Sequence, residues 1–253
     1  MKTFIVIPAH YGSTRLAGKV LLDIAGKPMV QHVYERAKKS RADQVMIATD
    51  DQRVFEAAKN FGADRYMTAA THRSGTERAS ELVERLKMAD DDIVIVLQAD
   101  EPLVPVVILD QLIDILKQKP DLSVATLCDP IDNMNDVFDP NVTRVVLDKN
   151  NFALYFSHAP MPWYRNGFSK EQKELPKDFN YYRHIGIYGY RAAFVRRYIK
   201  MPASQIEFVE CLEQLRILWN SEKIYVAIAK EKPGPGVDTQ EDLNRVRELL
   251  KNL

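Results

Sequence analysis

The first half of the chain alternates short β-branched runs with amphipathic helical segments, and this alternation restricts the fold more than any other feature. Strand, helix and strand in succession form a right-handed crossover, and repeated crossovers build a mostly parallel sheet with both faces covered. We therefore expect an α/β fold with a mostly parallel, Rossmann-like sheet. The expected strands span 4–7, 44–49, 92–98 and 123–127, and the expected helices span 29–40, 52–61, 76–86 and 108–118.

The pattern changes after about residue 128. Two apolar runs at 142–147 and 152–156 indicate a hairpin, and the polar stretch 163–179 is a candidate mobile loop. We expect a single domain, 1–253, with an antiparallel and dimerisation subregion inserted at about 129–190. The remaining expected elements are a loop at 129–141, strands at 185–190 and 224–229, helices at 192–198 and 206–219, a turn at 233–236 and a last helix from Gln240.

Charge and cysteine content exclude several classes of protein. The chain has 35 basic and 35 acidic residues, whereas a surface for nucleic acid or anionic membrane needs a basic excess. Two cysteines build neither a disulfide framework nor a zinc site. No uninterrupted apolar stretch approaches the roughly 18 residues of a membrane span. We expect a cytoplasmic protein that neither binds nucleic acid nor inserts into a membrane.

The loop 8–19 follows the first expected strand and has the composition of a phosphate-binding loop. Gly12 and Gly18 permit a close approach of backbone to ligand, and Arg15 and Lys19 supply positive charge suited to a polyphosphate. The loop is neither a Walker A nor a G-x-G-x-x-G motif, so an ordinary polar loop is the alternative. Its place favours a ligand, because ligands of such sheets bind beyond the carboxyl ends of the strands.

Two carboxylates stand at comparable places. Asp100 follows the most apolar expected strand, and Asp238 precedes the last expected helix. Mg²⁺ prefers one or two carboxylates together with substrate phosphates, so both are candidate metal ligands. Capping of the following helix is the alternative for each.

The segment 183–190 predicts a strand with an unusual polar face. Alternation places His184, Gly186, Tyr188 and Tyr190 on one side, where imidazole and phenol groups suit a hydroxyl-rich ligand. A half-solvated sheet face is the alternative. Glu213 and Gln214 lie on an expected amphipathic helix, where exposed polar side chains are the ordinary explanation.

Taken in order, these motifs resemble those of the 3-deoxy-manno-octulosonate cytidylyltransferases over residues 3–247. The resemblance implies a nucleotidyltransferase sheet, usually in a homodimer, that transfers CMP from CTP to the anomeric hydroxyl of the sugar acid Kdo. The products are CMP-Kdo, used in lipopolysaccharide biosynthesis, and pyrophosphate. The motifs that carry the resemblance are 8–19, 74–78, 98–102, 183–190, 213–216 and 236–238.

The resemblance also implies residue roles. Arg15, Lys19 and Asp100 would be catalytic, and Asp100 and Asp238 would bind the cofactor Mg²⁺. Such a transfer depends on positioning and charge neutralisation rather than on a protein nucleophile. The residues that bind CTP would be Ala9, His10, Arg15, Lys19, Ser74, Gly75, Thr76 and Arg78. Those that bind the sugar acid would be Gln98, His158, His184, Tyr188, Glu213 and Gln214.

The chain departs from the usual family pattern at four positions. His10 in the phosphate loop and His158 beside the expected sugar carboxylate stand where arginine is usual. Each replaces a permanent bidentate donor by a group that is half charged at about pH 6.5. Ala17 and Ala99 replace a usual proline and glycine. We expect weaker anion contacts or a sugar acid other than Kdo, unless a neighbour such as Arg165 takes over the role.

Three other functions stay open. A glycosyltransferase shares the sheet, but the sequence Gln-Ala-Asp-Glu at 98–101 is not its D-x-D motif. A catalytically silent nucleotide-binding regulator is disfavoured because the charged residues of the expected site are present. The nearest alternative is an enzyme that activates another octulosonic or nonulosonic acid, such as the 8-amino analogue of Kdo or a sialic acid.

Overall fold

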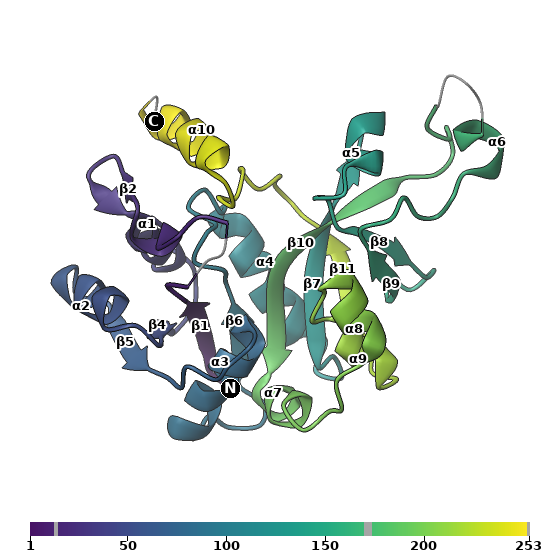
Figure 1. Ribbon diagram of the computed structural model, residues 1–253. Coiled ribbons are helices and arrows are strands. Elements are labelled where there is room, and N and C mark those ends of the chain that lie inside the picture. The colour runs from purple at the N-terminus through teal and green to yellow at the C-terminus, as the bar shows by residue number, and fades with distance from the viewer. Residues whose placement is uncertain (13–14, 170–173, 252–253) are drawn as a thin grey trace.

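A mostly parallel sheet forms the centre of the computed structural model, which describes residues 1–12, 15–169 and 174–251 (Figure 1). The strands of this sheet are β1 (Thr3–Pro8), β4 (Gln44–Thr49), β5 (Asp64–Met67), β6 (Ile93–Val96), β7 (Val124–Ile131), β8 (Arg144–Leu147), β9 (Ala153–Ser157), β10 (Tyr181–Arg191) and β11 (Tyr225–Ile228). Strands β2 (Asp23–Ile24) and β3 (Lys27–Pro28) form a separate two-stranded sheet. The order is β11-β7-β10-β6-β1-β4-β5, with β8 and β9 attached through β10. In this order β10 is antiparallel to its neighbours β6 and β7, and the other pairs are parallel.

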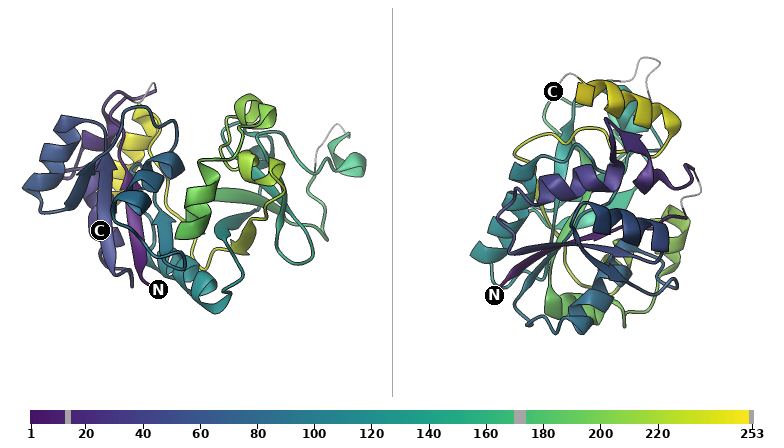
Figure 2. Two further views of the ribbon diagram at one scale, coloured as in Figure 1. Left: turned by 90° about the horizontal axis from the view of Figure 1, so that it is seen from below. Right: turned by 90° about the vertical axis from the view of Figure 1, so that its left-hand side faces the viewer.

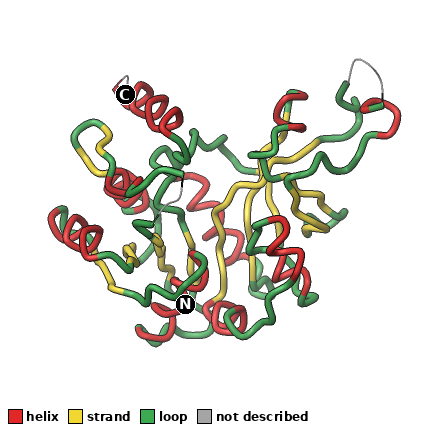
Figure 3. Tube along the Cα trace, in the orientation of Figure 1, coloured by secondary structure: helices red, strands yellow, loops and turns green. Residues whose placement is uncertain are grey.

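Helices cover both faces of the sheet, as the alternation predicts (Figures 2 and 3). They are α1 (Met29–Ala37), α2 (Gln52–Asn60), α3 (Gly75–Arg85), α4 (Val106–Gln118), α5 (Met134–Phe138), α6 (Arg165–Phe168), α7 (Ala192–Tyr198), α8 (Gln205–Glu210), α9 (Leu215–Trp219) and α10 (Gln240–Lys251). Along β1, Ile5 and Ile7 pack in one core with α1, α2 and α4. Phe4 and Val6 pack in the other with α3, α7 and α9. Because successive side chains of a strand point to opposite faces, β1 contributes apolar side chains to the cores on both sides of the sheet.

The structure confirms the expected strands and helices of the first half and the hairpin, which is formed by β8 and β9. The single helix expected over 206–219 is wrong. It is divided into α8 and α9 because Cys211 has φ 54°, a left-handed conformation that an α-helix cannot continue. The stretch expected to be a loop at 129–141 contains α5 and the end of β7. The candidate mobile loop 163–179 contains α6, and its residues 170–173 lie outside the described residues.

Strand β10 connects the central sheet with the small antiparallel part. Its first half pairs with β7 and, at Arg183, with β8, whereas its second half lies between β6 and β7. The register with β7 shifts between Ile185 and Tyr188. The fully buried Arg144 of β8 donates hydrogen bonds to the carbonyls of residues 136, 139, 142 and 158, and so ties the hairpin to α5.

The last helix, α10, lies beside the N-terminal elements β2 and α1 (Figure 1). Leu243 and Val246 pack with Val237, Ile24 and Met29 in a separate apolar cluster. The Val237 amide also donates a 2.9 Å hydrogen bond to the Asp100 carbonyl. These contacts bring the segment before α10 to the end of β6. Among the described residues, no helix is long and apolar enough to cross a membrane.

Candidate active site

The loop after β1 is closed by a short-range contact between Tyr11 and Gly18. The Gly18 amide donates to the Tyr11 carbonyl at 3.2 Å, and Gly18 adopts φ 62°. A Cβ at Gly18 would lie 2.8 Å from the Tyr11 ring, so glycine is required both by the conformation and by the close approach. Gly18 also precedes the 3₁₀ turn Lys19–Leu21. This local geometry turns the Lys19 side chain back toward the end of β6.

Lys19 bridges the two predicted metal ligands. Its Nζ lies 2.6 Å from Asp100 Oδ2 and 2.9 Å from Asp238 Oδ1, and it also donates to the Val237 carbonyl at 3.2 Å. Arg15 Nη2 donates to the same Asp238 oxygen at 2.8 Å. Burial acts to lower the pKa of Lys19, but the charges and hydrogen bonds of Asp100 and Asp238 outweigh it and raise the pKa. The predicted catalytic and metal-binding residues therefore form one cluster.

Glu101 adds a third carboxyl group beside this cluster. Burial, and then the negative charges of Asp100 and Asp238, raise the pKa of Glu101 to about 8. Gly236 leaves room for it, because a Cβ at Gly236 would lie 3.0 Å from Glu101 Oε1. Within the described residues, no three or more His, Cys, Asp or Glu side chains converge as a ready metal site.

Two residues predicted to bind CTP meet at Asp50, just after β4. His10 Nδ1 lies 2.8 and 3.0 Å from the Asp50 carboxylate oxygens, and Arg78 Nη2 lies 3.4 Å from Asp50 Oδ2. Arg78 is buried and also donates to Thr68 Oγ1 at 2.6 Å. Ala9, a third predicted CTP residue, uses its backbone N–H and C=O for hydrogen bonds within the protein.

The N-terminus of α3 lies close to the loop after β1. Ser74 caps the helix by accepting from the Glu77 amide. A Cβ on Gly75 would lie 2.9 Å from Pro8 Cγ and 3.4 Å from Gln98 Nε2, so glycine permits this approach. The close packing brings the predicted residues of the 74–78 motif beside Gln98. The exposed amides of a helix N-terminus favour anionic ligands.

Thr76 connects this helix to Glu213. Thr76 Oγ1 lies 3.3 Å from Glu213 Oε1 and 3.2 Å from the Tyr190 hydroxyl. Burial raises the pKa of Glu213, although hydrogen bonds from Ser74 and Thr76 oppose the rise. Gln214 is also buried, directly before α9. The motif at 213–216 is therefore not the exposed helix surface that was the ordinary alternative.

The aromatic face of β10 exists as predicted. The rings of His184 and Tyr188 lie 5.3 Å apart, and those of Tyr188 and Tyr190 are stacked at 5.6 Å. His184 Nε2 lies 3.0 Å from Thr126 Oγ1, and burial lowers the pKa of His184 to about 3. The buried Tyr188 hydroxyl and the buried Nδ1 of His158 have no hydrogen-bond partner among the described residues. A bound ligand could supply partners for both.

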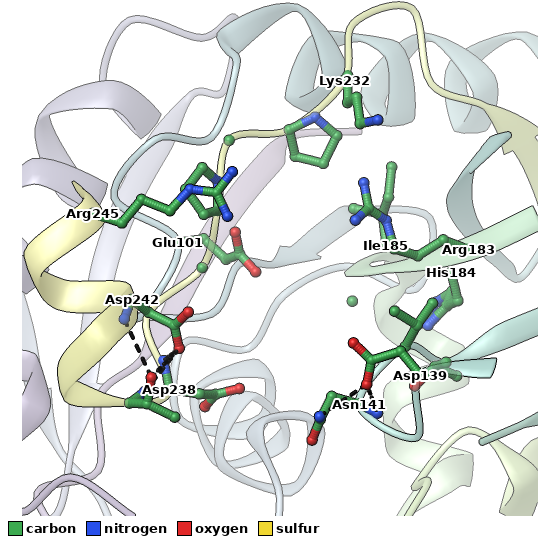
Figure 4. Close-up of a pocket in the computed structure, with 18 of the residues that line it drawn as sticks. Glu101, Asp139, Asn141, Arg183, His184, Ile185, Lys232, Asp238, Asp242 and Arg245 are labelled. Atoms are coloured by element: carbon green, nitrogen blue, oxygen red, sulfur yellow. Dashed lines mark hydrogen bonds between the residues drawn. The ribbon is translucent and has the colours of Figure 1, made fainter. Parts of the chain in front are cut away.

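Two cavities adjoin the Lys19 cluster. A cavity of 280 Å³ contacts Pro8, His10, Gly12, Arg15, Lys19, Val20, Gln98, Ala99 and Asp100. A larger one of 570 Å³ is shown in Figure 4, with Asp238, Asp242 and Arg245 on one wall and Asp139, Asn141 and His184 on the opposite wall. Arg15 lines both cavities. The other predicted site residues, 9, 74–76, 78, 158, 188, 213 and 214, do not line either of them.

Sequence reasoning missed several polar residues of the site. Asp50 follows β4 and Glu101 follows Asp100, so both stand at carboxyl ends of parallel strands. This is the same signal that singled out the loop after β1 and Asp100. Arg183 was named only as the start of a strand, yet it lines the larger cavity and lies 3.2 Å from Asp129 Oδ2.

Known proteins are similar to this chain in sequence and fold. A model of the family described as cytidylyltransferase matches residues 4–224. A 3-deoxy-manno-octulosonate cytidylyltransferase of Coxiella burnetii is 50% identical over 98% of this chain and 99% of its own, and that of Photobacterium profundum is 52% identical over 99% and 100%. A solved structure of CMP:2-keto-3-deoxy-manno-octonic acid synthetase complexed with CTP has a TM-score of 0.90 at 41% identity, covering 100% of this chain and 99% of that one.

These likenesses, together with a basic loop and carboxylates at one edge of the sheet, define the protein as an α/β nucleotidyltransferase. The similarity to the curated relatives extends over nearly the whole chain. The chain belongs to the 3-deoxy-manno-octulosonate cytidylyltransferase family.

Proposed function

We propose that the protein transfers CMP from CTP to the anomeric hydroxyl of Kdo and releases pyrophosphate. The observation that carries the proposal is the cluster of Arg15, Lys19, Asp100 and Asp238 between two cavities, in a chain about 50% identical to enzymes named for this reaction. The product would serve lipopolysaccharide biosynthesis. Because CTP is a cytoplasmic metabolite, we place the reaction in the cytoplasm.

The charged cluster suits phosphoryl chemistry. Arg15 and Lys19 would bind the phosphates that leave as pyrophosphate, and the positive charge would offset the negative charge that develops there. Asp100 and Asp238 fit a Mg²⁺ ion, since Mg²⁺ prefers one or two carboxylates plus substrate phosphates. Such an ion would supply charge neutralisation across the reacting phosphates. Lys19 would then exchange its carboxylate partners for a phosphate oxygen.

The nucleoside would lie against the N-terminus of α3. Ser74, Gly75 and Thr76 are within reach of the loop after β1, since Gly75 packs on Pro8. Arg78 would support this region from the interior of the protein, because its guanidinium is buried against Asp50 and Thr68.

The sugar acid would bind on the side of β10. Gln98 borders the smaller cavity and His184 the larger one. The Tyr188 hydroxyl and His158 Nδ1, which find no partner in the described part of the chain, would gain partners from sugar hydroxyl or carboxylate oxygens. His184 would act as a neutral hydrogen-bonding group, because burial holds its pKa at about 3.

We also propose a homodimer. Helices α8 and α9 pack together and α9 packs on β9, and this part of the surface carries exposed apolar side chains. Phe208 and Leu154 are each 60% exposed, Trp219 is 56% exposed and Val209 is 84% exposed. Apolar side chains gathered on one surface are characteristic of interfaces.

Pyrophosphate release tests the proposed function directly. The purified protein is incubated with Mg²⁺, CTP and Kdo, with UTP and dTTP as nucleotide controls and with the 8-amino analogue and a sialic acid as sugar-acid controls. We expect release with CTP and Kdo and little with the other pairs. Release that is fastest with a different sugar acid would refute the assignment of Kdo. No release with any pair would refute the transfer itself.

A further inference from the structure

The Asp50 carboxylate lies at a junction of three segments. It follows β4, accepts from His10 after β1, and faces Arg78 on α3. The Asp50 side chain is only 7% exposed and that of Arg78 only 3%, whereas that of His10 is 57% exposed. One buried carboxylate thus contacts a buried permanent cation on one side and an exposed imidazole on the other.

The contact with Asp50 determines how His10 presents its ring. An ionised carboxylate only accepts hydrogen bonds, so Nδ1 of His10 must carry the proton that it shares with Asp50. The opposite nitrogen, Nε2, then lies over Gly12, where an added Cβ would approach it to 2.6 Å. Both residues line the smaller cavity together with Arg15 and Lys19.

A phosphate oxygen in this cavity would meet Nε2 of a ring that is already oriented. A protonated Nε2 donates to the phosphate while Nδ1 donates to Asp50, so the carboxylate and the phosphate both stabilise the charged ring. Without the carboxylate, the imidazole would be free to rotate and would gain less from the phosphate alone.

We propose that Asp50 is a positioning residue that holds His10 as a phosphate donor in the nucleotide cavity. The carboxylate thereby compensates for the permanent charge of an arginine at this position. The inference rests on the proposed function, because it needs CTP in the smaller cavity. The Arg78 guanidinium pairs with Asp50 on the buried side of the carboxylate.

The test is the affinity for CTP with Mg²⁺, measured by calorimetry without any sugar acid. Asp50→Asn keeps the shape of the side chain and removes its charge. We expect it to weaken CTP binding about tenfold in the natural chain. In a His10→Gln background the same change should have an effect below about twofold, because no ring remains to be positioned. In a His10→Arg background it should also have little effect, because arginine stays charged without help.

A merely structural role of Asp50, exerted through Arg78, would give equal losses in all three backgrounds and would overturn the proposal. An unchanged CTP affinity in Asp50→Asn, made in the natural chain, would also overturn the proposal. If Asp50→Asn does not fold, the His10→Gln variant is measured alone, because this change leaves the Asp50–Arg78 pair intact. We expect His10→Gln to weaken CTP binding about tenfold and His10→Arg to leave it unchanged. Wild-type affinity in His10→Gln would refute the inference. If the unaltered protein does not bind CTP at all, the proposed function fails with it.

Discussion

The Lys19 ammonium lies 2.6 Å from the Asp100 carboxylate, which we propose as a ligand of Mg²⁺. In this structure the lysine therefore balances the charge of the site. If nucleotide and Mg²⁺ bind as proposed, Lys19 would leave Asp100 and Asp238. We therefore propose a double role for Lys19: it neutralises the two carboxylates in this structure and would bind phosphate oxygens when the nucleotide is present.

Removing the Lys19 charge should make folding depend on divalent ions. In Lys19→Met, Asp100 and Asp238 lose their common partner, and we expect a loss of about 1–2 kcal/mol in the free energy of unfolding, because both carboxylates are partly exposed. Millimolar Mg²⁺ should restore more stability to the variant than to the unaltered protein. Thermal unfolding with and without Mg²⁺ measures the difference.

Lys27→Met is the matched control, because Lys27 pairs with Glu35 at an exposed site. This change should cost well under about 1 kcal/mol and respond to Mg²⁺ like the unaltered protein. An equal response of Lys19→Met and Lys27→Met would contradict the double role of Lys19.

Gly18→Ala should disturb the phosphate loop. The new Cβ would lie 2.8 Å from the Tyr11 ring in a residue with φ 62°, so strain and overlap combine. We expect a loss of about 2–3 kcal/mol in stability and a raised KM for CTP. Gly26→Ala is the control, since Gly26 has φ 83° but no atom within 4 Å of its added Cβ. That variant should lose about 1 kcal/mol and keep its KM. A raised KM in both variants would show that backbone strain, and not contact with Tyr11, matters.

His184 should make the protein sensitive to acid. Burial lowers the pKa of His184 to about 3, below the ordinary value of 6.5. The folded state therefore resists protonation, and this contribution to stability is present above pH 6.5 and is lost as the pH falls toward 3. Between pH 7 and 5, the unaltered protein should lose about 2 kcal/mol more than His184→Gln. Chemical denaturation at the two pH values measures this, and equal losses would exclude a neutral, buried His184.

The proposed dimer predicts that one charge on α8 separates the subunits. Val209→Glu places a carboxylate at a residue that is 84% exposed in the monomer. Light scattering after size exclusion should give the mass of one chain for the variant and of two chains for the unaltered protein. Val107→Glu, at an exposed apolar residue of α4, should stay dimeric. A monomeric unaltered protein would contradict the proposal.

The sequence predicts the fold well where one pattern dominates. Ile5 and Ile7 alternate with Phe4 and Val6, and the two cores form as this alternation requires. The prediction fails where conformation depends on packing. Nothing in the amphipathic pattern of 206–219 shows that Cys211 turns left-handed, and the polar edge strand β5 has no apolar period.

The carboxyl ends of the predicted strands indicate candidate site residues, but they do not show which of these residues pair with one another. Lys19 and Asp100 were singled out because each follows a strand, yet the bridge between them depends on the turn at Gly18. Asp50 stands at an equivalent place and was missed, and the next residue, Asp51, is the one that caps α2. Only the packing of α3 against the strand ends shows that Asp50 joins His10 to Arg78.

The most direct test of the account is the rate of pyrophosphate release from CTP and Kdo in Asp100→Asn. Asp110→Asn, which alters a surface pair with Arg41, is the control. We predict that Asp100→Asn folds normally and loses at least about a thousandfold in kcat, while Asp110→Asn keeps its rate. A folded Asp100→Asn variant with a kcat close to that of the unaltered protein would contradict the role of Asp100 in the transfer of CMP.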